Sequence, residues 1–368
     1  MNIFKKTGAL AAFLNKTPIK TSAPCRIDMG GTLDIRSFHL PLGYLSPCTV
    51  NVALKLRTSV TLLPYEAGMI RVTSKGFDSA AFPLDTAPFN HPLGLVFAVA
   101  SYFRAEGVHV AVESASPPRS SLGGSSVAAV ALVAAFSSAS VKMGLGPELS
   151  LAQIALLAHA IEESVAGVPC GTQDQLAAAF GGVNAWYWKN GLQYPAFEQQ
   201  VLLPEGTLKD LEAHLLVAYC GIPHESRDVN TRWVRQFLAG ESREKWVEIT
   251  HLSRRFATAI QEMAIPAAIT AMNREMAIRS EMTPDVLDDI GKLLVTAATR
   301  SGCGARISGA GGGGCIWALA ETATIDRLRT EWQAILSTRA DARLLDAGID
   351  ARGVGIEERS LTEKRFQR

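Results

Sequence analysis

Short apolar runs in the first 75 residues predict β-strands. Residues 26–29, 49–56, 58–63 and 69–74 are rich in β-branched side chains or alternate apolar with polar positions, which is the period of a strand. Apolar positions at helical spacing then predict helices over 91–105, 125–141, 151–166 and 175–180. Ser150 and Gln153 have the spacing of a capping box, which marks the start of the helix over 151–166.

The second half of the chain has longer helical stretches. We expect, in order, a break at 204–206, a buried strand over 213–219, helices over 229–298 with turns at Pro266 and Pro284, a glycine-rich loop at 309–314 and a strand over 315–320. Strands and helices mix without regular βαβ alternation, so we expect an α+β protein and not a doubly wound sheet. The break divides the chain into a domain of residues 1–205 and a domain of residues 206–368.

The composition indicates a globular protein and narrows its partners. With 368 residues, of which 48% are hydrophobic, the chain can bury a large core. Its 36 Lys and Arg residues against 35 Asp and Glu residues give a net charge of +1, and no basic block stands out. We therefore expect no nucleic-acid partner, whereas a small anionic ligand needs only a few local charges.

The cysteines and the N-terminal segment favour a cytoplasmic location. The six cysteines are scattered without the spacing of a zinc site, as expected for free thiols in a reducing compartment. The N-terminal segment has two lysines and a short apolar run that is interrupted by Asn15 and Lys16. We interpret it as a helical extension and not as a secretory signal, and we expect no membrane partner.

The stretch PPRSSLGGSSVAAV, which begins at Pro117, places a small polar loop before an apolar helix. Backbone N–H groups at a helix start lack partners and, with the helix dipole, form an anion site. Glycine allows a phosphate to approach closely, and a serine hydroxyl can ligate Mg²⁺. The alternative is an ordinary loop that caps a core helix, and the chain has no Walker A motif.

Two further stretches carry candidate chemistry. Glu162 and Glu163 lie on one side of an expected turn and Asp174 on the other, which suits a metal ligand and a proton acceptor. A solvated helix face and a helix cap are the alternatives. The run RISGAGGGGC (306–315) has five glycines in six positions, each costing about 1 kcal/mol relative to alanine in regular structure. A mere connector is therefore disfavoured, and the alternative is a tight turn between closely packed elements.

These three stretches, together with a fourth near the N-terminus, resemble the motifs of the GHMP kinase superfamily. APCRID (23–28) with GGTLD (30–34) resembles the first, substrate-side motif, PPRSSLGGSS (117–126) the second and SGAGGGGC (308–315) the third. The resemblance implies the two-domain GHMP kinase fold. Residues 1–205 would form an N-terminal ATP-binding domain like ribosomal protein S5 domain 2, and residues 206–368 a ferredoxin-like C-terminal domain.

The sugar kinases are the most similar branch. GVPCG (167–171) is similar to galactokinases, and TQDQ (172–175) with FGGVN (180–184) is similar to heptose-phosphate kinases and fucokinases. In those families a metal-binding glutamate lies twelve positions before the catalytic aspartate, which selects Glu162 over Glu163 as the partner of Asp174. The same matching places Ser125 on a serine that helps to hold Mg²⁺, and Arg26 on the arginine beside the catalytic aspartate.

The resemblance implies that ATP and Mg²⁺ serve transfer of the γ-phosphoryl group to a sugar hydroxyl, with the anomeric hydroxyl of a hexose or heptose phosphate favoured. Asp174 and Arg26 are the implied catalytic residues, and Ser125 and Glu162 the metal ligands. The implied ATP-binding residues are Pro118, Ser120, Ser121, Leu122, Gly123, Gly124, Ser125 and Ser126. The implied acceptor-binding residues are Asp34, Gly30, Gly31, Gly171, Gln173, Gly309, Gly311 and Gly312.

The sequence departs from the family pattern at several positions. Ser121 replaces a glycine and Gly124 replaces a serine of the second motif, and the first motif is one residue shorter than in heptose or fucose kinases. A non-sugar alcohol such as mevalonate or homoserine therefore remains an alternative acceptor, and a non-catalytic sugar or ATP sensor an alternative function. Arg36 and Arg227 could contact an anionic substrate, although charged surface is the preferred interpretation. We expect a monomer or a homodimer.

Overall fold

The structure, a computed structural model, describes residues 8–167, 169–189, 195–223 and 226–357. Its strands are β1 (Ile19–Met29), β2 (Cys48–Pro64), β3 (Met69–Ser74), β4 (Phe77–Pro83), β5 (Val108–Ser114), β6 (Val183–Trp188), β7 (Phe197–Val201), β8 (Leu215–Tyr219), β9 (Gly304–Ile307), β10 (Cys315–Leu319), β11 (Arg343–Leu345) and β12 (Gly355–Ile356). Its α-helices are α1 (Ala9–Lys16), α2 (Arg36–His39), α3 (Gly94–Phe103), α4 (Gly124–Lys142), α5 (Leu151–Ala166), α6 (Gln173–Phe180), α7 (Leu208–Glu212), α8 (Ser226–Leu238), α9 (Arg243–Gln261), α10 (Ile265–Met282), α11 (Asp289–Arg300) and α12 (Thr322–Leu336).

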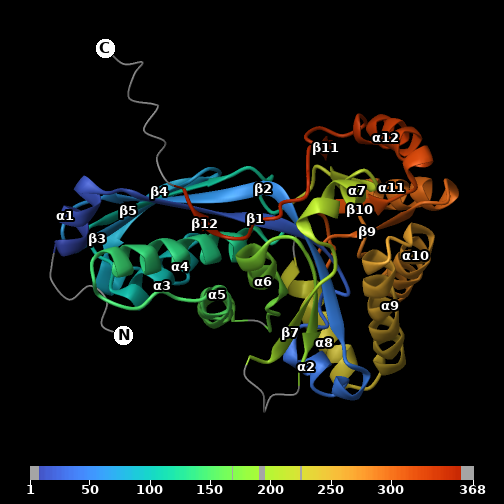
Figure 1. Cartoon of the computed structure of the whole chain (residues 1–368), viewed down its shortest axis with the longest axis horizontal. Coiled ribbons are helices and arrows are strands. Elements are labelled where there is room, and N and C mark those ends of the chain that lie inside the picture. Colours follow the sequence, from blue (N-terminus) through green and yellow to red (C-terminus); the bar gives the residue numbers. More distant parts are fainter. Residues whose placement is uncertain (1–7, 168, 190–194, 224–225, 358–368) are drawn as a thin grey trace.

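Two sheets organise these elements (Figure 1). Among the described residues, eight strands form the larger sheet in the order β12-β1-β2-β5-β3-β4, with β6 paired to β2 and β7 to β6. Four antiparallel strands form the smaller sheet in the order β11-β8-β10-β9. The predicted α+β class is confirmed.

Helix α4 is the core helix of the larger sheet. It packs against β1, β2, α5 and α6, and nearly all of its side chains from Ser126 to Ser140 are buried. Within the described part of the chain it is the one helix whose length and apolar composition could span a membrane, but 72% of that stretch is buried inside the protein. Its apolar character is explained by burial against the sheet.

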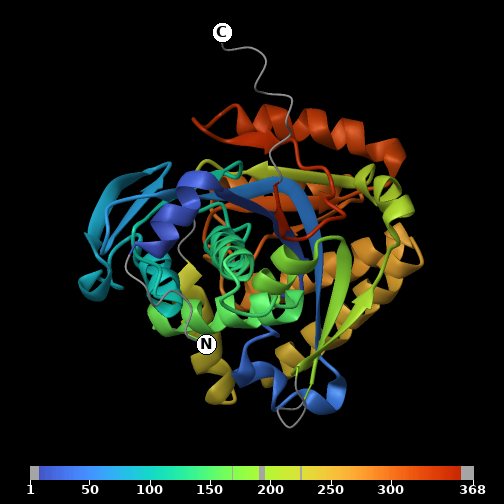
Figure 2. The same ribbon diagram turned by 60° about the vertical axis from the view of Figure 1, so that its left-hand side comes forward.

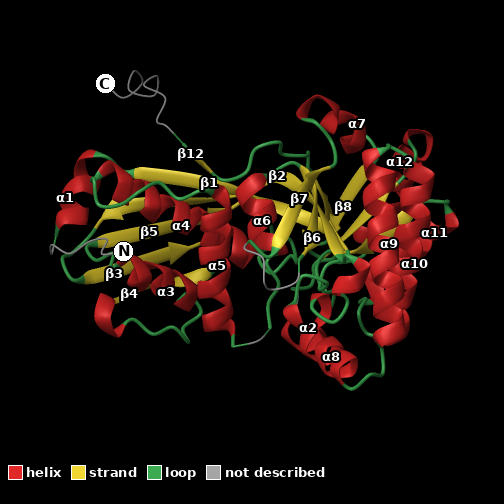
Figure 3. Cartoon of the chain, turned by 60° about the horizontal axis from the view of Figure 1, so that its bottom comes forward, coloured by secondary structure: helices red, strands yellow, loops and turns green. Residues whose placement is uncertain are grey.

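Helices α9, α10, α11 and α12 gather around the smaller sheet (Figure 3), whereas α8 lies beside α2. Helix α10 packs against α9 and β9, while α12, red in Figure 2, packs against α11 and β11. The chain then returns to the larger sheet, where Ile356 of β12 pairs with Thr21 of β1. The division at residues 205 and 206 stays a prediction, and this last segment crosses it.

Several predicted boundaries were wrong. The strands expected over 49–56 and 58–63 form one strand, β2. Where the first expected segment ends, the pairing with β1 shifts register and leaves Lys55 and Leu56 as a bulge, so the strand continues. The helices expected over 229–298 have an additional break between α8 and α9, at 239–242. Pro266 does not lie in a connecting loop, as expected, but in the first helical turn of α10. This position agrees with the preference of proline for helix starts.

Candidate active site

Helix α4 begins without a side-chain cap and leaves backbone N–H groups free. Gly123 precedes the helix with a φ of 79°, a left-handed conformation that glycine adopts without steric cost. The first helical hydrogen bond runs from Val127 N to Gly123 O (2.9 Å), so the N–H groups of Gly124, Ser125 and Ser126 precede it. These groups and the helix dipole favour an anion at this point.

The loop before α4 is fastened by Arg26. Ser121 has a φ of 65°, which is left-handed although serine is not glycine. Nη1 of Arg26 donates to the carbonyl oxygen of Ser121 (2.8 Å), and the backbone N–H of Arg26 donates to the carbonyl oxygen of Leu122 (3.2 Å). These two hydrogen bonds hold the unusual backbone at the position where the second motif normally has glycine.

Ser125 and Glu162 meet at the start of α4. The hydroxyl of Ser125 donates to Oε1 of Glu162 (2.6 Å), and the side-chain amide of Gln175 donates to Oε2 (2.7 Å). Burial raises the pKa of Glu162, and the hydrogen bonds from the side chains around it oppose the shift. No basic side chain in the described ranges forms an ion pair with this carboxylate. A half-buried carboxylate beside an exposed hydroxyl, without a cation, suits a hard metal ion.

Arg26 and Asp174 form an ion pair beside this loop. Nε of Arg26, on β1, donates to Oδ1 of Asp174, in the first turn of α6, at 2.7 Å. Arg26 is buried, whereas 23% of the Asp174 side chain is exposed. Burial alone would lower the pKa of Arg26, but the charges of Asp174 and Asp28 outweigh it and raise that pKa. A Cβ atom on Gly123 would lie 3.3 Å from Oδ2 of Asp174, so this carboxylate adjoins the α4 loop.

The glycine-rich turn of the third motif contacts the same group of residues. The hydroxyl of Ser308 accepts a hydrogen bond from Nη1 of Arg26 (3.0 Å), and the N–H of Gly309 donates to Oδ1 of Asp28 (2.6 Å). A Cβ atom on Gly314 would lie 2.7 Å from Cβ of Ser121, which is too close for any side chain. The third motif thus packs directly against the loop of the second.

Asp34 lies buried on the acceptor side predicted from the first motif. The N–H of Gln173 donates to Oδ2 of Asp34 (3.0 Å), and Asn51 on β2 donates to Oε1 of Gln173 (2.9 Å). A Cβ atom on Gly171 would lie 1.7 Å from Oδ2 of Asp34, so only glycine fits. Burial raises the pKa of Asp34 to about 7; the hydrogen bond from Gln173 opposes the shift and the charge of Asp174 adds to it.

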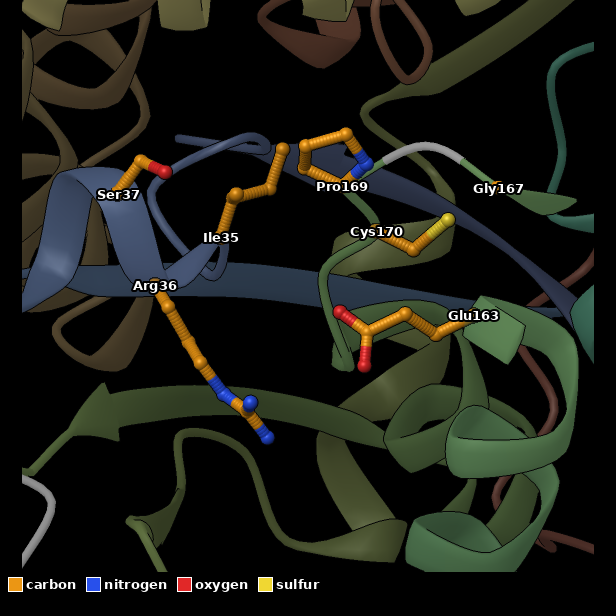
Figure 4. Close-up of a pocket in the computed structure, with 7 residues that line it drawn as sticks. All are labelled: Ile35, Arg36, Ser37, Glu163, Gly167, Pro169 and Cys170. Atoms are coloured by element: carbon orange, nitrogen blue, oxygen red, sulfur yellow. The ribbon is translucent and has the colours of Figure 1, made fainter.

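A pocket of about 370 Å³ lies at the segment that follows Asp34. It is lined by Ile35, Arg36, Ser37, Glu163, Gly167, Pro169 and Cys170 (Figure 4). Figure 4 shows Arg36 extending from α2 on one side and Glu163 from α5 on the other. Because Ile35 follows Asp34 directly and Cys170 precedes Gly171, the pocket lies next to the predicted acceptor residues. Arg36 is exposed, as expected for charged surface, and it also lines this pocket; the side chain of Arg227 lies outside the described residues.

Two family models match the chain. "GHMP kinases N terminal domain" matches residues 91–182, and "GHMP kinases C terminal" matches residues 257–338. The chain belongs to the GHMP kinase family. Membership in this family implies a kinase that uses ATP, and the predicted two-domain GHMP kinase fold is confirmed.

Curated relatives include kinases for two kinds of acceptor. A mevalonate kinase of Pyrococcus horikoshii is 27% identical over 73% of this chain and 81% of its own length. A D-glycero-alpha-D-manno-heptose 7-phosphate kinase of Campylobacter jejuni is 26% identical over 80% and 87%. Among solved structures, Lactococcus lactis galactokinase complexed with galactose superposes with a TM-score of 0.70 at 16% identity, covering 94% of this chain and 99% of its own.

The predicted site residues of this GHMP kinase fall into three groups by position. Arg26, Asp174, Glu162 and the loop 118–126 converge at the start of α4, and Asp34, Gly171 and Gln173 lie together beside them. The N–H of Gly309 donates to the carboxylate of Asp28. Gly311 and Gly312 pack against Val286, whose carbonyl oxygen accepts from the Gly312 N–H (2.8 Å).

Sequence reasoning missed several polar partners in this site. Gln175 holds Glu162, Asn51 holds Gln173, and Asp28 holds Gly309. Asp28 and Gln175 belong to the sequence motifs described above, so the sequence did point to these two residues. Asn51 stands in a strand without any local pattern that would mark it.

Proposed function

We propose that this kinase transfers the γ-phosphoryl group of ATP to a hydroxyl group of a sugar or sugar phosphate. The observation that carries the proposal is the Arg26–Asp174 ion pair, which lies directly beside the uncapped start of α4. A proton acceptor and an anion site are thereby adjacent, as phosphoryl transfer requires. The pocket beside Asp34 supplies space of about 370 Å³ for part of the acceptor.

In the proposed reaction Asp174 takes or orients the proton of the acceptor hydroxyl. The acceptor oxygen then forms a bond to the γ-phosphorus, the bond from that phosphorus to the β–γ bridging oxygen breaks, and ADP leaves. Arg26 keeps Asp174 in place through Nε, and its charge offsets the negative charge that develops nearby. Asp34 would hydrogen-bond acceptor hydroxyls, since its carboxyl accepts from the Gln173 N–H and forms no ion pair in the described ranges.

The residues at the start of α4 fit ATP with Mg²⁺. The free N–H groups of Gly124, Ser125 and Ser126 would hold phosphate oxygens, and no heavy atom lies within 4 Å of a Cβ placed on Gly124. Glu162 and Ser125 would hold Mg²⁺, which neutralises charge on the β- and γ-phosphates when bound. Within the described residues no three His, Cys, Asp or Glu side chains cluster as a metal site. This agrees with Mg²⁺ held by few protein ligands and by phosphates.

Mevalonate, a non-sugar alcohol, is a second candidate acceptor. The specific observation in its favour is the similarity to archaeal mevalonate kinases, such as that of Pyrococcus horikoshii, at 27% identity. The heptose 7-phosphate kinase of Campylobacter jejuni supports the sugar acceptor at nearly the same identity. The family resemblance of the segment 167–175 favours the sugar, and an assay must separate the two.

The test is ATP-dependent product formation across galactose, other free hexoses, heptose 7-phosphate and mevalonate. We expect a phosphorylated sugar or sugar phosphate, with the new phosphate located by NMR. Asp174→Asn should reduce kcat on that acceptor by about a hundredfold or more, because the proton acceptor is lost. Asp85→Asn, which alters an exposed ion pair with Arg104, serves as the control and should leave kcat unchanged. Phosphorylation of mevalonate alone, or a kcat of Asp174→Asn within tenfold of wild type, would overturn the proposal.

A further inference from the structure

A buried chain of charged groups extends from the proposed active site into the second half of the protein. Arg26 contacts Asp28 (3.3 Å), Asp28 contacts Arg306 (3.2 Å), and Arg306 contacts Glu275 (3.1 Å). Glu275 lies on α10 and Arg306 on β9, so the chain joins the smaller sheet and its helices to β1. Its longest contact, from Arg306 to Asp28, joins residues that are 278 positions apart.

Glu275 is the branch point of this chain. Its Oε2 accepts from Nε of Arg306 (3.1 Å), and its Oε1 accepts from Nε of Arg279 (2.5 Å). Its side chain is fully buried, as are those of both arginines. Burial alone would raise the pKa of Glu275, but the charges of Arg279 and Arg306 outweigh it and lower that pKa. One ionised carboxylate therefore holds two guanidinium groups that point to different parts of the site.

Two arms of this chain leave Glu275, one through Arg306 and one through Arg279. The Arg306 arm leads to the proposed catalytic pair, Arg26 and Asp174. Nη1 of Arg306 donates to the carbonyl oxygen and to Oδ2 of Asp28, and Oδ1 of Asp28 accepts from Gly309 and contacts Arg26. Burial alone would raise the pKa of Asp28, but Arg26 and Arg306 lower it. A fixed Asp28 therefore fixes Arg26, and Arg26 holds Asp174.

The Arg279 arm leads to the turn that carries Asp34. Nη2 of Arg279 donates to the carbonyl oxygen of Gly31 (2.6 Å), three residues before Asp34. The same guanidinium lies over the rings of Trp233 (4.8 Å) and Trp246 (5.3 Å). Phe38, just beyond the turn, packs on Trp246 with ring centroids 4.3 Å apart. The acceptor-side segment is thus held at two points by the helices of the second half.

We propose that Glu275 is a positioning residue for phosphoryl transfer, holding the catalytic pair through Arg306 and the acceptor-side turn through Arg279. The proposal rests on the proposed function, since it takes Asp174 and Asp34 in the roles given above. In the described residues the connected groups are three guanidinium groups and three carboxylates: Arg26, Arg279, Arg306, Asp28, Asp174 and Glu275. Loss of the Glu275 charge leaves two buried guanidinium groups poorly compensated, so both arms should loosen.

The two arms predict different kinetic effects, one on kcat and one on the acceptor KM, and a merely structural role would not separate them. In Arg306→Lys, one ammonium group cannot reproduce the planar contacts to Asp28 and Glu275, so we expect kcat to fall about tenfold or more with the acceptor KM within threefold. In Arg279→Lys, the Gly31 contact and the stacking are lost, so we expect the acceptor KM to rise about tenfold or more with kcat within threefold. Glu275→Gln should show both effects.

The experiment compares these variants of the full chain with wild type and with Arg274→Gln. Arg274 lies on the same helix, next to Glu275, and its exposed ion pair with Glu248 (2.7 Å) makes it the matched control, for which we expect unchanged constants. Melting temperatures are recorded for each variant, and kinetics are measured well below them. If Glu275→Gln does not fold, the two arginine variants still carry the test. Constants that stay within threefold of wild type in both arginine variants would overturn the proposal.

A second readout separates this proposal from the proposed function. Hydrogen–deuterium exchange of the unliganded protein should speed up at 304–309 in Arg306→Lys and at 30–35 in Arg279→Lys, and stay unchanged in Arg274→Gln. Unchanged exchange at both segments overturns the positioning role even when wild type is active. A wild-type protein that phosphorylates no acceptor overturns the proposed function, and the exchange pattern then decides the positioning role independently.

Discussion

At the scale of single residues, two buried aspartates six positions apart have opposite electrostatic environments. Asp28 faces the guanidinium groups of Arg26 and Arg306, which lower its pKa although burial alone would raise it. Asp34 receives one hydrogen bond from the N–H of Gln173, and burial raises its pKa to about 7. A carboxyl that is costly to ionise and that adjoins a pocket is suited to hydrogen-bond a polar ligand, because the ligand replaces the water that burial removed.

The pKa of Asp34 predicts a dependence of stability on pH. The folded protein keeps the Asp34 proton up to about pH 7, whereas the unfolded chain releases it near the ordinary value of 3.8. The contribution of Asp34 to stability is therefore fully present below pH 3.8 and falls by about 1.4 kcal/mol per pH unit up to about pH 7. Asp34→Asn cannot ionise and escapes this loss. We expect its melting temperature to exceed that of wild type at pH 8, with a smaller difference at pH 5.

The same variant should lose function while gaining stability. At pH 8, where the Asp34 carboxyl of wild type is ionised, acceptor KM should rise about tenfold or more, because the amide replaces one acceptor oxygen by an N–H donor. Thermal unfolding at pH 5 and pH 8 with parallel kinetics checks both effects, and Asp85→Asn provides an exposed control. A melting-temperature difference that is equal at the two pH values would contradict the assignment.

At the scale of elements, local sequence signals predicted the helices that hold the site better than the strands. The capping box formed by Ser150 and Gln153 begins α5, and the glycine at position 167 ends it. The core helix α4 was also predicted, because its apolar run and its small-residue start are local. Strands β4 to β7 and β9 were missed or only partly indicated, since their short segments gain stability from neighbours far along the chain.

The candidate site shows the same contrast between residues that local motifs identify and contacts that depend on the tertiary fold. The motif letters placed Arg26, Glu162 and Asp174, which the fold brings together. No local pattern could place Glu275 on Arg306 or Arg306 on Asp28, because a contact across 278 positions depends on how two sheets pack.

For the element α4, we predict the effect of replacing Gly123, the glycine with a left-handed backbone conformation that precedes the helix. Gly123→Ala should cost about 1–2 kcal/mol of stability, because its φ of 79° disfavours a side chain. The new methyl group would also lie 3.3 Å from Asp174, so we expect kcat to fall as that carboxylate moves. Gly240→Ala is the matched control: its φ is 86°, nothing lies within 4 Å of the added Cβ, and it lies between α8 and α9. Urea unfolding should give similar losses for both variants, and only Gly123→Ala should lose activity; equal activities would contradict the proposed contact.

At the scale of the whole molecule, the end of the described chain completes the first sheet. After β11 the chain passes Asp350, which pairs with Arg57 on β2, and reaches β12 beside β1. Arg57 also donates to the carbonyl oxygen of Gly353 (2.9 Å). This returning segment packs on the C-terminal end of α6, the helix whose first turn carries Asp174. The two halves are therefore joined both by the buried charges and by this segment.

Two glycines in the returning segment allow this connection to be tested. A Cβ atom on Gly353 would lie 1.9 Å from the carbonyl oxygen of Ala179, near the end of α6, whereas a Cβ atom on Gly355 meets nothing within 4 Å. Gly353→Ala should therefore lower the free energy of unfolding by about 1–3 kcal/mol, the usual cost of overpacking, and Gly355→Ala should leave it nearly unchanged. Because α6 carries Asp174 at its other end, displacement of the segment should also reduce kcat in Gly353→Ala. Thermal unfolding and steady-state kinetics of the two variants check this. Equal behaviour of the two would show that the returning segment does not support α6.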